Sequence, residues 1–428
     1  MRYLLHDVFT NTVDRYPERT AIVVEGGRII SYADLHTLSN KFGHRIQKTK
    51  SDSRRFPFVG VLSTVFPESI AAVLGTLKIG CAYVPLDEYS PVERLQKIVD
   101  NTQMDTLVVD PIFAEQFRSL FDAPSIRTVI LLRNQNSFVH EKAILFEDIL
   151  RQSGEDLPII NQVSDDLAYI LHSSGSTGVP KGIMLTHRNA RTFVDWMQKE
   201  FALTPDDVVM SRAPFKFDLS VFDIFNTFKA GATLVCYDWN KKREGDQKHK
   251  DYVGLMAETK ATIIYTTPST FIALMNHGGL DSAQLSLREI MYAGEPFPVP
   301  QLKKLQKCLP KTRIANIYGP TETNIITYWW ADTIPDDATE IPLGYVVEDT
   351  EILIVSEEGD RICNPDELGE IWCRGGTVTL GYLGMNEKTR ACRVLSPFHK
   401  HPVYFWKTGD YGFRDGHGIL LYIGRKDD

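Results

Sequence analysis

Short apolar strands alternate with helix-forming stretches over the first three quarters of the chain. In the first half the expected strands are residues 59–63, 82–86, 106–109 and 128–132, with helices at 33–47, 67–79, 91–100 and 111–121. After residue 187 the alternation of strands and helices resumes. The expected helices are 189–201, 220–229 and 298–307, and the expected strands are 208–211, 233–236, 262–266, 289–292 and 313–316. This alternation predicts parallel sheets with helices on both faces. We therefore expect an α/β fold.

The predicted secondary structure changes near the C-terminus. From about residue 340, short strands such as 351–355 and 369–373 alternate with turn clusters, which predicts a small antiparallel, β-barrel-like unit. We expect two stacked, helix-flanked β-sheet subdomains followed by this smaller unit. The predicted boundaries are 1–170 for the first α/β subdomain, 171–335 for the second, 336–424 for the β subdomain and 425–428 for a hinge.

Charge and cysteine content narrow the classes of partner. The net charge is −8, from 47 basic and 55 acidic residues, which disfavours nucleic acid or an anionic membrane as the main partner. The six cysteines form no CxxC pair and have no histidine at metal-ligand spacing, so we expect reduced thiols. No signal-peptide core and no run of eighteen apolar residues occurs, so we predict a cytoplasmic protein without membrane spans.

Residues 170–182 form the most distinctive loop. A short strand leads into Ser173-Ser174-Gly175-Ser176-Thr177-Gly178, followed by Val179, Pro180, Lys181 and Gly182. Backbone amides beside glycine, hydroxyl groups and one lysine suit a polyphosphate. The spacing differs from that of a Walker loop, because Gly175 and Gly178 are too close and Gly182 follows Lys181. Taken alone, the loop also fits a flexible turn.

Several further stretches appear with this loop in a fixed order. They are 30–35 (ISYADL), 77–87 (LKIGCAYVPLD), 217–220 (FDLS), 316–322 (NIYGPTE), 369–371 with 381–383 (GEI and GYL), 407–410 (KTGD) and 424–427 (GRKD). With them the sequence resembles the adenylate-forming superfamily. It is most similar to amino-acid adenylation domains of nonribosomal peptide synthetases and to stand-alone amino acid–carrier protein ligases, and the resemblance spans nearly the whole chain.

The resemblance implies a reaction. A carboxylate attacks the α-phosphorus of ATP, giving an acyl adenylate and pyrophosphate, and a carrier-protein phosphopantetheine thiol then takes the acyl group. Such chemistry needs positioning and charge neutralisation rather than a side-chain nucleophile. The cofactors implied are ATP and Mg²⁺, and the partners are an amino acid and a phosphopantetheinylated carrier protein.

The resemblance also assigns site residues. The implied catalytic residues are Thr177, Lys181, Thr321 and Glu322, with Glu322 as the Mg²⁺ ligand. The implied ATP-binding residues are Ser173, Ser174, Gly175, Ser176, Thr177, Gly178, Lys181, Gly294, Glu295, Asn316, Tyr318, Gly319, Thr321, Asp410 and Arg425. Tyr318 would stack on adenine and Asp410 would accept the ribose hydroxyls. A simpler interpretation of Glu322 is a carboxylate at a helix N-terminus. His172 departs from the family pattern, and we interpret it as a packing variant.

Asp218 indicates the substrate class. In amino-acid-activating relatives the matching aspartate pairs with the substrate ammonium, whereas relatives that take fatty or aryl acids generally lack it. The alternative is a helix cap. The implied substrate pocket comprises Asp218, Leu219, Phe222, Ser269, Met291, Ala293, Ile317, Ile325 and Ile326. Because this lining offers no charge for an ionised side chain, we expect a small neutral amino acid, with proline or alanine favoured.

The resemblance further implies a mobile C-terminal lid domain beyond Asp427, whose lysine would contact the adenylate. We expect this chain to be the large core without that lid, to bind ATP and amino acid, and to adenylate slowly. Two other functions are considered: an acyl- or aryl-CoA ligase, and a non-catalytic ATP-binding scaffold. The sequence leaves open the amino acid, the carrier protein, the oligomeric state and whether the parent is a multidomain synthetase.

Overall fold

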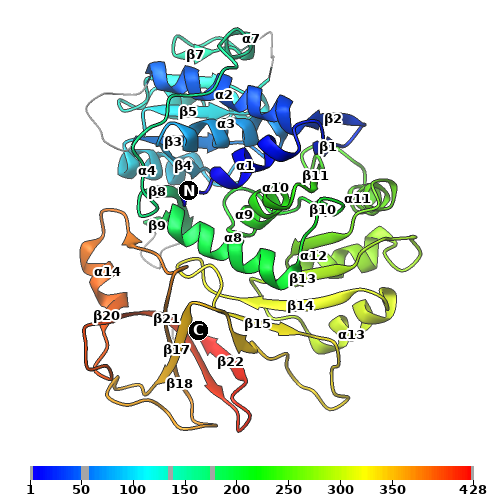
Figure 1. The fold of residues 1–428 in the computed structure, drawn as a ribbon, viewed down its shortest axis with the longest axis vertical. Helices are drawn as coiled ribbons and strands as arrows, with labels where there is room; N and C mark the ends of the chain where they lie inside the picture. Colours follow the sequence, from blue (N-terminus) through cyan, green and yellow to red (C-terminus); the bar gives the residue numbers. More distant parts are fainter. Residues whose placement is uncertain (1–2, 50–56, 134–137, 174–178, 426–428) are drawn as a thin grey trace.

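The computed structural model describes residues 3–49, 57–133, 138–173 and 179–425. The strands of these residues form three sheets, of eight, nine and five strands. Figure 1 shows the eight-stranded sheet at the top of the view, the nine-stranded sheet below it on the right, and the five-stranded sheet at the bottom. The predicted fold class, two stacked α/β sheet units with a smaller antiparallel unit, is confirmed.

The eight-stranded sheet is parallel at its centre. Its order is β19 (Gly381–Tyr382), β9 (Lys181–Thr186), β8 (Leu167–Ser173), β4 (Ala82–Pro85), β3 (Phe58–Leu62), β5 (Thr106–Val109), β6 (Thr128–Leu131) and β7 (Ala143–Ile144). Strands β8, β4, β3, β5, β6 and β7 pair in parallel, whereas β9 is antiparallel to β8 and β19 to β9. A segment near residue 381 thus completes a sheet built mainly from the first 186 residues.

The nine-stranded sheet also combines distant segments. Its order is β16 (Tyr345–Val346), β15 (Thr327–Trp330), β14 (Arg313–Tyr318), β13 (Glu289–Tyr292), β12 (Ile263–Thr266), β10 (Val208–Met210), β11 (Thr233–Cys236), β1 (Thr20–Val24) and β2 (Arg28–Ser31). Strands β1 and β2 form a hairpin around Gly26-Gly27, a dipeptide that is typical of such turns. This hairpin joins the sheet through β1 and β11, with Ile22 opposite Leu234 in parallel register.

The five-stranded sheet is antiparallel and contains β17 (Thr350–Val355), β18 (Gly369–Gly375), β20 (Arg393–Leu395), β21 (Tyr404–Arg414) and β22 (Leu420–Arg425). Strand β21 is its centre and pairs with β18, β20 and β22. The register of β21 with β22 places Asp410 directly opposite Arg425.

The helices fall into three groups along the chain. The helices before β8 are α1 (Asp7–Arg15), α2 (Tyr32–Thr49), α3 (Pro67–Lys78), α4 (Val92–Thr102), α5 (Pro111–Ala114), α6 (Arg118–Phe121) and α7 (Phe146–Leu150). The next are α8 (His187–Phe201), α9 (Leu219–Val221), a π-helical turn (Phe222–Asn226), α10 (Thr227–Ala230), α11 (Gln247–Glu258), α12 (Pro268–Ala273) and a second π-helical turn (Leu274–Gly278). The last are α13 (Val299–Cys308) and α14 (Asn386–Cys392).

The starts of two helices follow local signals. Thr186 caps α8, and its hydroxyl accepts a hydrogen bond from the Asn189 amide at 3.1 Å. Asp110 caps α5 by accepting from the Ile112 amide, with Pro111 in the first helical position. Threonine and aspartate are typical of these positions, because a short acceptor side chain satisfies an amide that has no partner within the helix.

One hydrophobic core joins the two large sheets. It includes Ile22, Leu74, Tyr169, Phe193 and Met291, which are fully or almost fully buried and come from β1, α3, β8, α8 and β13. A second core covers the other face of the nine-stranded sheet. Alternating strand residues separate the two cores, since Tyr265 and Met291 belong to the first and Ile264 and Ile290 to the second.

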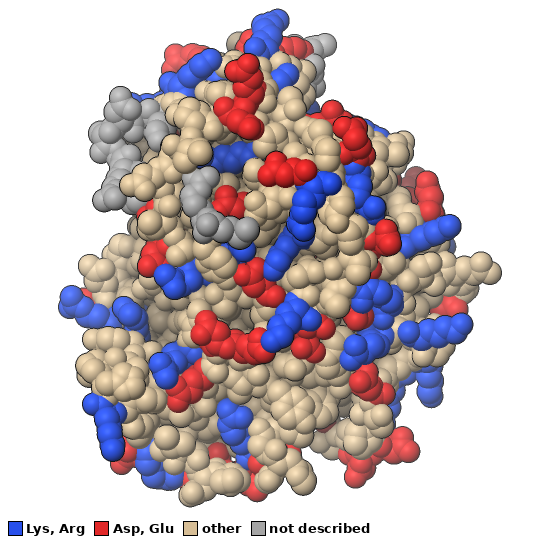
Figure 2. Space-filling model, in the orientation of Figure 1, with Lys and Arg blue, Asp and Glu red and all other residues tan. Residues whose placement is uncertain are grey.

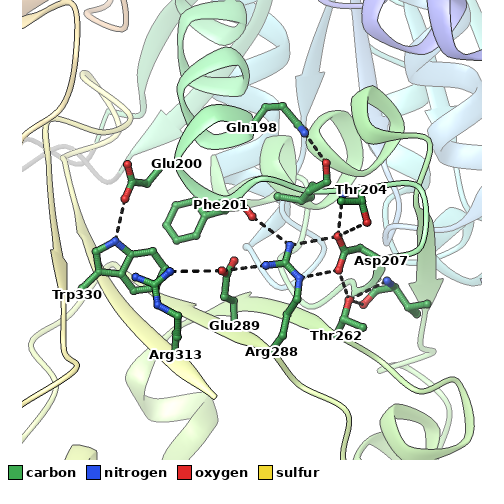
Figure 3. A network of polar contacts seen from close by, with 12 residues as sticks. Gln198, Glu200, Phe201, Thr204, Asp207, Thr262, Arg288, Glu289, Arg313 and Trp330 are labelled. Atoms are coloured by element: carbon green, nitrogen blue, oxygen red, sulfur yellow. Dashed lines mark hydrogen bonds and ion pairs between the residues drawn. The ribbon is translucent and has the colours of Figure 1, made fainter. Parts of the chain in front are cut away.

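A polar network fixes one end of the nine-stranded sheet to helix α8. Arg288 donates to both carboxylate oxygens of Asp207, from Nε at 2.8 Å and from a terminal nitrogen at 3.1 Å, and to the carbonyl of Phe201 at 3.0 Å. Thr262 also donates to Asp207, at 2.8 Å. Figure 3 shows this network continuing through Glu289, while Trp330 donates to Glu200 at 2.8 Å. A buried carboxylate is stable here because several donors surround it.

Three local predictions need correction. The helix expected at 111–121 is divided into α5 and α6. Residues 239–251 are a charge run that is typical of an exposed loop; most of them are exposed, but the Arg243 side chain is nearly buried between Glu25 and Asp251, and α11 begins at Gln247. Glu322 does not begin a helix, because residues 321–323 form a turn that leads into β15.

The domain boundaries at residues 170 and 335 stay a prediction, although the sheets cross them. Strands β1 and β2 belong to the nine-stranded sheet, whereas β9 and β19 belong to the eight-stranded one. All six cysteines are free, and three of them (Cys81, Cys236 and Cys373) are buried. No helix among the described residues is both long and apolar enough to span a membrane. Lysine and arginine side chains are interspersed with acidic ones on the face shown in Figure 2.

Candidate active site

A cavity of about 370 Å³ lies where the nine-stranded sheet meets the five-stranded sheet. Its lining includes seven of the predicted nucleotide-binding residues, namely Gly294, Glu295, Asn316, Tyr318, Gly319, Asp410 and Arg425. Gly294 and Glu295 follow β13, the next three lie in or just after β14, and the last two belong to β21 and β22. The carboxyl ends of parallel strands β13 and β14 therefore open towards the antiparallel unit, which is the usual place for a ligand site in such sheets.

A short hydrogen bond joins the two sheets within this cavity. The Tyr318 hydroxyl donates to Oδ2 of Asp410 at 2.6 Å, and Arg425 Nε lies 3.7 Å from Oδ1. The side chain of Asp410 is buried, and its backbone amide donates to Thr408. Burial, together with the Asp410 carboxylate, raises the pKa of Tyr318 well above its ordinary value. The phenol therefore remains a neutral donor and Asp410 an acceptor.

Two glycines shape the backbone around Tyr318. Gly294 has φ +90°, a conformation that favours glycine. A Cβ on Gly319 would lie 2.4 Å from the carbonyl oxygen of Asn324, so only glycine fits this turn. Asn316 is held by donating to the carbonyl of Pro342 at 2.8 Å, and Glu295 accepts from the amide of Ser269 at 2.7 Å.

A second cavity, of about 420 Å³, lies at the ends of β4 and β8. Its lining includes Ser173, Thr321 and the ion pair between Lys216 and Asp87, whose atoms are 2.6 Å apart. Two predicted phosphate ligands from distant segments therefore share one space. The predicted ligands Ser174, Gly175, Ser176, Thr177 and Gly178 lie outside the described residues.

His172 also lines this second cavity. Burial lowers its pKa to about 4, and the charge of Arg94 contributes to the shift. Neither ring nitrogen has a hydrogen-bond partner within the described part of the chain, and the ring packs beside Gly182. The imidazole is therefore neutral at pH 7. Its tight packing supports the interpretation as a packing variant.

Lys181, Glu322 and Tyr382 form a polar group next to the second cavity. Lys181 begins β9, and its Nζ lies 5.7 Å from the ring centroid of Tyr382. The Tyr382 hydroxyl donates to Oε1 of Glu322 at 2.7 Å. We assigned no role to Tyr382 from the sequence, although it lies within the quoted motif at 381–383.

Glu322 fits a Mg²⁺ ion that arrives with phosphates. Among the described residues no group of three histidine, cysteine, aspartate or glutamate side chains is arranged to hold a metal. Mg²⁺ commonly takes one or two carboxylates and completes its shell with substrate phosphates and water. One half-buried carboxylate beside Lys181 and Thr321 suits such an ion, whereas a metal cage made only of protein would not form there.

Asp218 lies at the start of α9, where its side chain is half-buried. Burial raises its pKa to about 7; nearby amides oppose the shift and the charge of Glu322 adds to it. Its side chain makes no capping hydrogen bond to the helix, which argues against the helix-cap alternative. The charge of Asp218 contributes to raising the pKa of Tyr169 and Tyr265, so both phenols lie near it. Tyr265 and Tyr169 carry no sequence signal that marks them as neighbours of Asp218.

Most of the predicted pocket residues belong to the extended core that joins the two large sheets. They are Leu219, Phe222, Met291, Ala293, Ile317, Ile325 and Ile326. Phe222 packs edge-on against Tyr265, with ring centroids 5.4 Å apart. Ser269 differs from the others because it is exposed at the start of α12. Asp218 is therefore a carboxylate beside a mainly apolar environment.

Comparison with known proteins gives consistent matches. Residues 9–383 match the family described as AMP-binding enzyme. The chain is 31% identical over 427 residues to L-proline–[L-prolyl-carrier protein] ligase of Pseudomonas fluorescens, covering 99% of this chain and 80% of that protein. It is 30% identical over 403 residues to D-alanine–D-alanyl carrier protein ligase of Bacillus velezensis, covering 93% and 74% of the two chains.

Solved structures show the same fold. The AMPPNP-bound nonribosomal peptide synthetase FmoA3 superimposes with a TM-score of 0.86 and 25% identity, covering 100% of this chain and 43% of that one. IdnL7, with a TM-score of 0.82 and 23% identity, is similar in fold over 100% of this chain and 82% of its own.

Proposed function

Because the chain belongs to the family of AMP-binding enzymes, we propose that it activates a small neutral amino acid with ATP and passes it to the phosphopantetheine thiol of a carrier protein. The observation that carries this proposal is the pairing of two features. A nucleotide-sized cavity contains the linked Tyr318 and Asp410. A half-buried carboxylate, Asp218, lies near apolar residues and close enough to Glu322 to be affected by its charge.

The nucleotide half of the site is built to position a nucleoside. The Asp410 carboxylate can accept hydrogen bonds from two neighbouring hydroxyls. The Tyr318 hydroxyl keeps that carboxylate in place by donating to it. The tyrosine ring and the adjacent glycines line a cavity whose volume is within the range of small-molecule sites. We propose that adenine and ribose bind here, with Asn316 and the 294–295 backbone at the edge of the base.

The phosphate half of the site supplies positive charge. We propose that Lys181, Ser173 and Thr321 donate to phosphate oxygens, and that Glu322 would hold Mg²⁺. A bound Mg²⁺ ion would neutralise phosphate charge and make the α-phosphorus easier to attack. The protein's own contribution is to orient the carboxylate and the phosphate, which supplies much of the rate when the reacting atoms are held in line.

The amino acid half of the site selects an ammonium group. Asp218 would pair with it, and the apolar residues around Phe222 and Met291 would surround a small uncharged side chain. The relatives named for L-proline and D-alanine agree with this size and charge. The exact amino acid, the carrier protein and a cytoplasmic location remain predictions.

The test is a binding and exchange panel. Calorimetry should show binding of ATP and of one or a few small neutral amino acids, and ATP–pyrophosphate exchange should depend on the same amino acids. Asp218→Asn should weaken amino acid binding about 100-fold and leave ATP binding unchanged. Activation of fatty or aryl acids, unaffected by Asp218→Asn, would instead indicate an acyl- or aryl-CoA ligase. Absence of ATP binding would indicate a non-catalytic scaffold.

A further inference from the structure

Two lysines from distant segments meet beside the proposed phosphate site. Lys181 begins β9, and Lys388 lies in the first turn of α14. Lys181 lies over the ring of Tyr382 in β19, the strand to which α14 is fixed, and its charge acts on Lys388. Each lysine is only partly buried. The sequence offered no sign of this, because Lys388 is one lysine in a polar helix of seven residues.

The fold holds Lys388 in this place through a short chain of contacts. Strand β19 pairs with β9, with Tyr382 opposite Ile183, and the Leu383 amide donates to the carbonyl of Gly182 at 2.7 Å. Helix α14 is then fixed to β19, because the Tyr382 amide donates to the Thr389 hydroxyl at 2.9 Å. The position of Lys388 relative to Lys181 is therefore set by backbone pairing rather than by a loose surface chain.

The local charge is unbalanced. No ion pair joins Lys181 or Lys388 to a carboxylate within the described residues, although the charge of Glu322 attracts Lys388. Glu322 itself is held by the Tyr382 hydroxyl at 2.7 Å. The two lysines are neighbouring like charges that repel each other, so the arrangement is most stable when an anion with several oxygens lies between them.

We propose that Lys388 is a second cationic ligand, alongside Lys181, for the β- and γ-phosphates of ATP and for the pyrophosphate that leaves. This inference rests on the proposed function. In the adenylation step a carboxylate oxygen forms a bond to the α-phosphorus, and the bond from that phosphorus to the bridging oxygen breaks. The electron pair leaves on pyrophosphate, whose charge increases, and two lysines donate to it without any proton transfer.

The proposal predicts a ligand-specific loss. Lys388→Met should weaken the binding of ATP and of inorganic pyrophosphate about tenfold, because one charge-assisted contact is removed. Binding of AMP should not change, since AMP lacks both outer phosphates. Lys388→Arg should retain pyrophosphate affinity within about threefold. The matched control is Arg390→Met, which removes a positive charge from the same helix two residues away, on a different side.

Calorimetry with ATP, AMP and inorganic pyrophosphate, under one ionic strength, measures these affinities without requiring turnover. Unchanged pyrophosphate affinity in Lys388→Met would overturn the proposal. Equal losses for AMP and pyrophosphate, or an equal loss in Arg390→Met, would also overturn it, because they would indicate a structural or long-range effect. Failure of the proposed function has a different signature: the wild-type protein would bind ATP and pyrophosphate but activate no amino acid.

Discussion

The pKa of Asp218 makes amino acid binding depend on pH in a defined direction. Burial raises this pKa to about 7 in the empty site, so the carboxylate is half protonated at neutral pH. Only the ionised form pairs with an ammonium group. A bound ammonium stabilises the ionised form and lowers the pKa, so binding and deprotonation of Asp218 favour each other. Amino acid affinity should therefore fall as the pH is lowered through 7.

The size of the effect follows from the fraction of ionised Asp218. With a pKa of about 7, roughly nine tenths of the protein is ionised at pH 8 and roughly one tenth at pH 6. The dissociation constant of the amino acid should thus rise about tenfold between these values. Asp218→Asn should raise it about 100-fold at pH 8, because the ammonium would lose its ionic partner in a buried site.

Calorimetric titration of the activated amino acid at pH 6, 7 and 8 measures the dependence, and titration of AMP over the same range is the control. Asp223 is the main competing group, because burial also raises its pKa to about 7. A tenfold change that survives in Asp218→Asn would assign the titration elsewhere. Equal affinity of the wild-type protein at pH 6 and pH 8 would refute the reasoning directly.

Three other changes test separate parts of the structure. Asp410→Asn should weaken ATP and AMP binding about tenfold in calorimetry while amino acid affinity stays the same, because an amide accepts less well from two hydroxyls. Arg288→Ala should lower the free energy of unfolding in urea by about 2 kcal/mol, because the buried carboxylate of Asp207 loses its charged partner. Gly319→Ala should lower that free energy by about 1–3 kcal/mol and reduce ATP binding, because the new Cβ would clash with the carbonyl oxygen of Asn324; unchanged ATP affinity would contradict this.

Local sequence signals predicted most elements but not which sheet they join. The hairpin around Gly26-Gly27 and the cap at Thr186 depend on neighbouring residues, so they could be inferred from short windows. The pairing of β1 with β11, across more than 200 residues, could not, because an apolar strand shows that it is buried without showing its partner. The same limit explains why β19 was not expected beside β9.

The same limit applies to the candidate site, where some residues could be predicted from the sequence and others could not. The family motifs predicted Tyr318 and Asp410, and the structure places both at one cavity. Tyr265 and Lys388 were missed, since each reaches the site through contacts between segments that lie far apart in the chain. Motif reasoning thus finds residues whose roles recur among relatives, while residues positioned by this particular packing require coordinates.

The proposed residue roles also predict the direction in which a substrate binds. An amino acid has an ammonium and a carboxylate on adjacent atoms, so a site must distinguish its two ends. With the roles proposed above, Asp218 would attract the ammonium and repel the carboxylate, while Lys181 and Lys388 would supply positive charge on the phosphate side. The carboxylate would then be directed away from Asp218 and towards the phosphates, which is the orientation required for attack on the α-phosphorus. A substrate without an ammonium would lose this alignment as well as a contact, so we expect Asp218 to contribute to positioning in addition to affinity.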